Sequence, residues 1–85
     1  MAEVKVYTTT YCPYCVRAKS LLKSKGIAYE EIDVTADHVL RERMVADSGR
    51  RTVPQIFIAG RPIGGFEELK ALDDAGELDP LVAQG

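Results

Sequence analysis

The order of hydrophobic and polar residues along the chain predicts strands and helices that alternate in sequence. Residues 3–7 place apolar side chains at every second position, which is typical of a strand. Pro13 suits the first turn of a helix, because the amide hydrogen that proline lacks would have no partner there. Apolar residues spaced three and four apart continue this helix to Gly26, a residue that ends helices with a left-handed cap.

The rest of the chain repeats this alternation. A second strand is predicted over residues 27–34, and a second helix runs from a cap at Asp37 to about Ser48. In chain order, the remaining predicted elements are a doubly buried strand at 55–59, a short strand ending at Ile63, a helix from Gly64-Gly65 to Gly76 and a final helical turn at 79–82.

The predicted order β-α-β-α-β-β-α indicates an α/β protein. Its strand–helix–strand start favours a parallel pair with a right-handed crossover. The tight turn between residues 55–59 and the strand ending at Ile63 favours an antiparallel hairpin. We therefore expect a four-stranded mixed sheet with helices on both faces, in a single domain over residues 1–85.

Composition excludes several classes of function. Eleven lysines and arginines against 13 acidic residues give a net charge of -2, which does not favour nucleic acid or an anionic membrane as a partner. The chain shows no secretory signal pattern, and no apolar run approaches the ~20 residues of a membrane span. We therefore expect a cytoplasmic protein, and a monomer because the pattern leaves no long exposed apolar stripe.

The two cysteines, Cys12 and Cys15, carry the most distinctive chemistry. In a reducing compartment such a close pair is redox-active or metal-binding more often than structural. Cys12 is predicted at the start of the first helix, where unpaired amides and the helix dipole favour a thiolate. Cys15 lies one turn further on the buried face, positioned to attack a mixed disulfide at Cys12. Cys12 is therefore the expected nucleophile and Cys15 the resolving thiol.

Two other interpretations of this pair remain open. A structural zinc site needs four ligands, and beyond the cysteines the chain offers only His38, on a predicted amphipathic helix where a solvated histidine is expected. The pair could also be two incidental buried cysteines, although Pro13 and Tyr14 between them at a helix start do not favour this.

Four stretches of the chain resemble the dithiol glutaredoxins, in particular the small bacterial ones. They are Cys12-Pro13-Tyr14-Cys15, Thr52-Val53-Pro54-Gln55-Ile56-Phe57-Ile58, Gly64-Gly65 and Glu67-Glu68-Leu69. The first two motifs in this order are highly specific, and with the predicted strand order the resemblance spans nearly the whole chain. It implies a thioredoxin-like fold, glutathione as reducing co-substrate, no metal, and glutathionylated or disulfide-containing proteins as substrates.

The same resemblance implies a glutathione site built from distant parts of the chain. A cis bond before Pro54 would turn the Val53 backbone toward an extended peptide, whereas a proline opening a buried strand is otherwise expected to be trans. Bare amides after Gly64-Gly65 would receive the γ-glutamyl carboxylate. The implied glutathione-binding residues are Tyr14, Arg41, Thr52, Val53, Pro54, Gly65, Phe66 and Glu67.

Two positions depart from the family pattern. Thr9 stands three residues before Cys12, where glutaredoxins often carry a lysine that would lower the thiol pKa and grip glutathione. Glu67 stands where aspartate commonly meets the glutathione ammonium, and it is longer by one methylene. We therefore expect a less acidic Cys12 thiol, or weaker glutathione binding, than is usual in the family.

Three rival functions are weighed against this one. A redoxin served by a flavin thioredoxin reductase is disfavoured by Tyr14 and by the stretch 64–67. A [2Fe–2S] cluster held between two subunits by Cys12 and glutathione is disfavoured by Pro13, where cluster binders often have glycine or serine. A thioredoxin-like module for protein contact alone is disfavoured by the intact cysteine pair.

Overall fold

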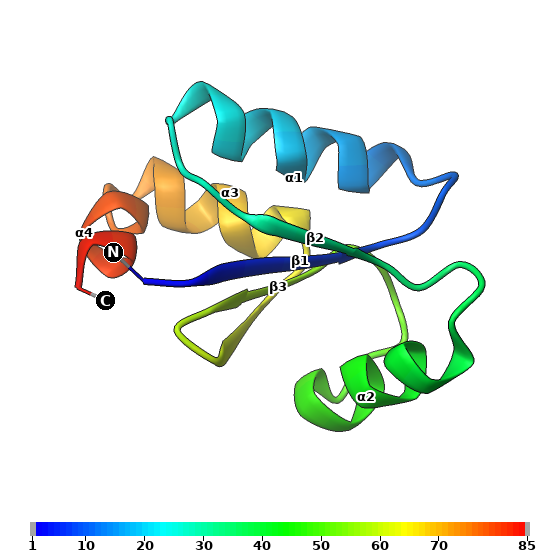
Figure 1. Ribbon diagram of the computed structural model, residues 1–85. Helices are drawn as coiled ribbons and strands as arrows, with labels where there is room; N and C mark the ends of the chain where they lie inside the picture. The colour runs from blue at the N-terminus through cyan, green and yellow to red at the C-terminus, as the bar shows by residue number, and fades with distance from the viewer. Residues whose placement is uncertain (1, 85) are drawn as a thin grey trace.

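The strands predicted from the apolar pattern assemble into a four-stranded mixed sheet in the computed structural model, which describes residues 2–84 (Figure 1). The strands are β1 (Val4–Thr8), β2 (Glu30–Asp33), β3 (Gln55–Ile58) and β4 (Arg61–Gly64), in the spatial order β2-β1-β3-β4. The helices are α1 (Pro13–Ser24), α2 (His38–Ser48), α3 (Phe66–Asp74) and α4 (Leu78–Ala83). The predicted fold class is confirmed, and the final helical turn is a short helix.

Strand pairing follows the two connection types that the sequence predicts. β1 and β2 are parallel and joined through α1, whereas β1–β3 and β3–β4 are antiparallel. Helices α1, α3 and α4 cover one face of the sheet, and α2 alone covers the other (Figure 1). No helix within residues 2–84 is long and apolar enough to cross a bilayer.

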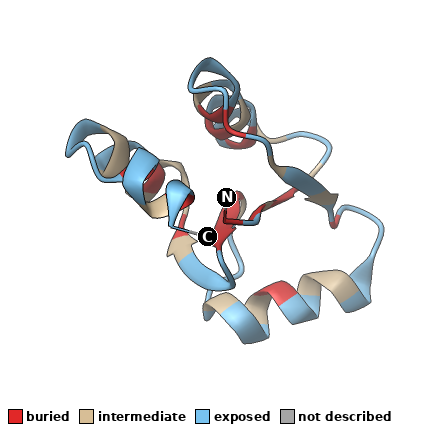
Figure 2. Cartoon of the chain, turned by 60° about the vertical axis from the view of Figure 1, so that its left-hand side comes forward, coloured by how far each residue is buried: buried red, intermediate tan, exposed pale blue. Residues whose placement is uncertain are grey.

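Alternation along the central strands creates two hydrophobic clusters, one on each face of the sheet. Buried positions, coloured red, lie on the strands and on helices to either side of them (Figure 2). The larger cluster, beneath α1, α3 and α4, includes Val4, Val6, Ala18, Leu22, Ile56, Ile58, Leu69, Leu78 and Val82. The smaller cluster, beneath α2, consists of Tyr7, Val34, Met44 and Phe57. Met44 is fully buried and is the only buried residue of α2, and the partly buried Leu40 and Val45 pack against the same cluster.

The second strand is shorter than the range 27–34 predicted from its apolar residues. Ile27 is buried, but its amide donates to the carbonyl of Leu22 (2.9 Å), so it belongs to the turn that ends α1. Pairing with β1 begins only at Glu30, opposite Lys5. An apolar side chain can therefore enter the core without its backbone joining the sheet.

Candidate active site

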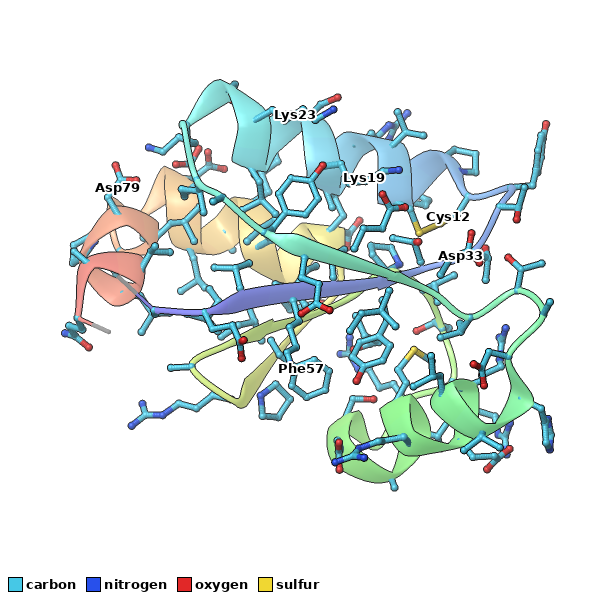
Figure 3. The ribbon with its side chains drawn as sticks, viewed as in Figure 1. Cys12, Lys19, Lys23, Asp33, Phe57 and Asp79 are labelled. Atoms are coloured by element: carbon cyan, nitrogen blue, oxygen red, sulfur yellow. A yellow bond between two sulfur atoms is a disulfide. The ribbon has the colours of Figure 1, made fainter. Side chains whose placement is uncertain are left out.

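Helix α1 begins at the cysteine pair, as the sequence predicts. Cys12 is the N-cap with an extended backbone, and its Sγ accepts a hydrogen bond from the amide of Cys15 (3.1 Å). Cys12 lies at the start of α1 (Figure 3) and is partly exposed, whereas Cys15 is 1% exposed. The two sulfurs form a disulfide. An amide donor and the positive end of a helix both favour a thiolate at Cys12 once this disulfide is reduced.

The Val53–Pro54 segment lies against the Cys12 sulfur. The peptide bond between these residues is cis, and the Val53 carbonyl oxygen lies 3.7 Å from Cys12 Sγ. The buried amide of Gln55 supports the segment, because its Nε2 donates to the carbonyl (2.9 Å) and the hydroxyl (3.2 Å) of Thr52. The cis geometry implied for Pro54 is thus present beside the cysteines.

A groove of about 320 Å³ runs beside these residues. It is lined by Tyr14, Arg50, Thr52, Val53, Pro54, Gly65, Phe66, Glu67 and Glu68. The lining comes from the start of α1, the loop before β3 and the start of α3. The rings of Tyr14 and Phe66, both in this lining, have centroids 6.3 Å apart, and the Arg17 guanidinium lies 5.1 Å from the Tyr14 ring centroid. All the predicted glutathione-binding residues except Arg41 line this groove.

Arg41 lies outside the lining of the groove. Its Nη2 donates to the backbone carbonyl of Arg51 (3.1 Å), one residue before Thr52. This hydrogen bond ties α2 to the loop that carries one wall of the groove. The structure therefore gives Arg41 a backbone contact that the sequence pattern does not show.

The start of α3 forms one wall of the groove. Gly65 is its N-cap and has no side chain to bond the first amides of the helix, including those of Phe66 and Glu67. A Cβ atom at Gly65 would lie 3.4 Å from the carbonyl oxygen of Pro54, an ordinary van der Waals distance, so the N-cap of α3 lies next to the proline. At Gly64, where φ is +121°, a Cβ would lie 2.6 Å from Glu68 Oε1.

Arg50 and Glu68 also line the groove, and sequence reasoning missed both. Glu68 Oε1 accepts from the Gly65 amide (2.6 Å) and from Arg50 Nη1 (3.1 Å). The hydrogen bond from the Gly65 amide has the largest effect on the Glu68 carboxyl and lowers its pKa below the usual value; the hydrogen bond from Arg50 lowers it further. The spacing of Glu68 after the N-cap is that of a capping box, a signal that could have identified it. Nothing in the sequence indicates where the side chain of Arg50 reaches.

The threonine-rich loop between β1 and α1 is held by side chains of the edge strand and of the loop after it. The buried hydroxyl of Thr8 donates to Glu31 (2.8 Å), which also binds Lys19 (3.0 Å). The Lys19 ammonium, assisted by Thr8, lowers the pKa of the Glu31 carboxyl. The Thr10 amide donates to the hydroxyl of Thr35 (2.6 Å), just beyond Asp33 at the end of β2 (Figure 3). These contacts position the backbone that leads into Cys12.

Replacing Thr9 by lysine tests the effect of the missing cation. A positive charge near Cys12 Sγ favours the thiolate, so we expect a lower thiol pKa and alkylation about threefold faster on the acidic side of the profile. The measurement is the pH dependence of iodoacetamide labelling of the reduced protein. Thr9→Gln, which adds length without charge, is the control. A Thr9→Lys profile that coincides with that of the wild type would contradict the prediction.

The thioredoxin-like fold, with a cysteine pair at a helix start beside a cis proline, defines the class of thiol–disulfide oxidoreductases. Within residues 2–84 no group of three or more His, Cys, Asp or Glu side chains is arranged to hold a metal ion.

Comparison with known proteins specifies the family. Residues 4–63 match the sequence profile of the glutaredoxins. The chain is 52% identical over 82 residues to Glutaredoxin 3 of Escherichia coli, covering 96% of this chain and 99% of that protein. It is 45% identical over 83 residues to the glutaredoxin of Pseudomonas aeruginosa, covering 98% and 99%. A buckwheat glutaredoxin–glutathione complex superposes with a TM-score of 0.90 at 30% identity, covering 98% of this chain and 78% of that one. The chain belongs to the glutaredoxin family.

Proposed function

We propose that glutathione is the reducing co-substrate of this oxidoreductase, and that glutathionylated and disulfide-containing proteins are its oxidised substrates. The observation that carries the proposal is the groove beside Cys12, which joins the Val53 backbone to the uncapped amides at the start of α3. An extended tripeptide with a carboxylate at one end and a sulfur at its centre matches that arrangement. The resemblance to a glutathione-bound buckwheat glutaredoxin supports it.

In the proposed complex the glutathione sulfur lies next to Cys12 and is flanked by the Tyr14 ring. The central residue of glutathione pairs with the backbone of Val53, as an added strand would. The γ-glutamyl carboxylate accepts hydrogen bonds from the amides of Phe66 and Glu67, where the helix dipole also favours an anion. The Glu67 carboxylate meets the adjacent ammonium.

The remaining contacts of the proposed complex complete the groove. Thr52, Pro54 and Gly65 are part of its lining. Arg41 donates one guanidinium hydrogen to the Arg51 carbonyl. In the proposed complex its other guanidinium hydrogens donate to the glycyl carboxylate of glutathione.

The proposed reaction proceeds by two thiol–disulfide exchanges. The Cys12 thiolate attacks the glutathionyl sulfur of a mixed disulfide, the target thiolate leaves, and Cys12 carries glutathione. The thiolate of a second glutathione then attacks that sulfur, which releases oxidised glutathione and restores Cys12. For a protein disulfide, Cys15 displaces the reduced substrate from Cys12, forming the disulfide present in the structure, which two glutathiones reduce.

The energetics of the family permit this direction of electron flow. Glutaredoxin pairs have potentials of about −200 to −230 mV, against about −220 to −260 mV for a cytosolic glutathione pool measured by extraction. Because 30 mV corresponds to about 1.4 kcal/mol, such a pool can drive the reaction modestly. We also propose that the protein is a monomer and that it works in the cytoplasm, where such a glutathione pool is found.

The test is which reductant restores the dithiol. We expect turnover of a glutathionylated peptide and of a small disulfide with glutathione, glutathione reductase and NADPH, and little turnover with thioredoxin reductase and NADPH. The readout is NADPH oxidation, with each reductase alone as control. Efficient turnover with thioredoxin reductase and none with glutathione would overturn the proposal in favour of the rival redoxin. Visible absorption of a cluster after anaerobic purification would indicate the second rival.

A further inference from the structure

The groove contains one cationic side chain among the described residues that line it. That residue is Arg50, and the same lining carries two carboxylates, those of Glu67 and Glu68. Thr9 adds no charge near Cys12, and Arg41 is bonded to a backbone carbonyl outside the lining. The ligand proposed above carries two carboxylates and one ammonium, so the local balance of charge bears directly on its binding.

Glu68 places a negative charge where an incoming anion would bind. Its Oε1 lies 2.6 Å from the Gly65 amide, within the first turn of α3. The amides of Phe66 and Glu67 belong to the same turn, so an unbalanced carboxylate there would repel a ligand carboxylate. Arg50 Nη1 lies 3.1 Å from the same oxygen and offsets that charge.

The contact with Arg50 comes from a different part of the chain. Arg50 lies in the loop between α2 and β3, and its hydrogen bond spans 18 residues to α3. Both side chains are about half exposed (50% and 43%), so water and salt screen the attraction between their charges. Both residues nevertheless belong to the lining of the groove. The ion pair therefore links the two walls of the groove at its charged end.

We propose that Arg50 is a positioning and specificity residue of the groove. It holds the Glu68 carboxylate on the Gly65 amide and cancels its charge, so the start of α3 stays attractive to a ligand carboxylate. The groove thereby selects mixed disulfides whose small-thiol half ends in a carboxylate, such as glutathione, over those formed with neutral or cationic thiols. The inference rests on the proposed function.

The test is a double-mutant cycle with Arg50→Gln, Glu68→Gln and the double variant. Glutamine at position 68 keeps an oxygen acceptor for the Gly65 amide and removes only the charge. The measurements are KM and kcat for a glutathionylated peptide, and the Kd of unreactive S-methylglutathione at low and high salt. Arg50→Lys is the charge-conserving variant. Arg43→Gln is the control, because Arg43 forms its ion pair with Asp47 on α2 and does not line the groove.

We expect Arg50→Gln to raise KM and Kd about threefold to fivefold at low salt, with kcat unchanged and a smaller effect at high salt. Glu68→Gln should bind S-methylglutathione at least as tightly as the wild type. The double variant should return to near the wild-type values. Arg50→Lys should retain most of the affinity, and Arg43→Gln should behave as the wild type.

Three results would overturn the inference. They are an unchanged KM in Arg50→Gln, a loss in Arg50→Gln that the second substitution does not relieve, and weaker binding in Glu68→Gln alone. The second result would mean that Arg50 contacts the ligand directly, and the third that Glu68 does. If Arg50 and Glu68 are coupled as expected in S-methylglutathione binding, but glutathione supports no turnover, only the proposed function would be overturned. No binding by the wild type would overturn both.

Discussion

Replacement of Cys12 by serine is expected to reduce the turnover of every disulfide substrate on the order of a thousandfold or more, because the hydroxyl cannot replace a thiolate nucleophile. Cys12 is the partly exposed sulfur at the helix start, next to the Val53 carbonyl, whereas Cys15 is buried behind it. Cys15→Ser should therefore keep much of the turnover of glutathione mixed disulfides, since a second glutathione can resolve them. Cys15→Ser should no longer reduce protein disulfides by the reaction that forms the Cys12–Cys15 disulfide.

The glutathione-coupled assay separates the two roles when it is run with a glutathionylated peptide and with a protein disulfide. Thermal unfolding of both variants in the reduced state is the control, because a serine hydroxyl at the buried position 15 can lower stability by itself. Substantial activity of Cys12→Ser on either substrate would show that the nucleophile has been assigned to the wrong sulfur.

Truncation of Met44 to alanine is expected to lower the free energy of unfolding by about 2–4 kcal/mol, because a fully buried side chain is replaced by a cavity. The thioether packs among Tyr7, Val34 and Phe57, and α2 has no other fully buried residue to hold it on the sheet. The measurement is urea denaturation of the reduced protein, followed by circular dichroism.

Val39→Ala is the matched control on the same helix. Val39 is 76% exposed, so its truncation should change stability by less than about 0.5 kcal/mol. Because α2 leads into the loop that carries Arg50 and Thr52, a loosened helix should also raise KM for the glutathionylated peptide. A Met44→Ala protein as stable as Val39→Ala would mean that α2 is held by contacts other than this one.

Local features of the site could be predicted from the sequence because they depend on neighbouring residues. A helix start needs only an extended N-cap residue and a suitable first residue, and Cys12 and Pro13 supply both. Asp37 at the start of α2 and Gly49 at its end follow the same logic, and both are confirmed. The mixed sheet follows because connection length decides between parallel and antiparallel pairing.

The features that could not be predicted depend on where long side chains and backbone segments meet in space. The Arg50–Glu68 ion pair joins the loop before β3 to helix α3, and no periodic pattern reports the direction of an arginine side chain. The contact of Arg41 with the Arg51 carbonyl is of the same kind. The length of β2 was overestimated because hydrophobicity reports burial, and Ile27 is buried without pairing to β1.

The missing side chain at Gly64 has a consequence for how this enzyme can diverge. Its φ of +121° is one that L side chains rarely adopt, and a Cβ there would lie 2.6 Å from Glu68 Oε1. Elsewhere much of the sequence can change while the fold persists, in keeping with a TM-score of 0.90 at 30% identity to the buckwheat protein. A single methyl group at position 64 would strain the backbone ahead of α3 and displace the Glu68 carboxylate, which many exchanges on the surface would leave in place.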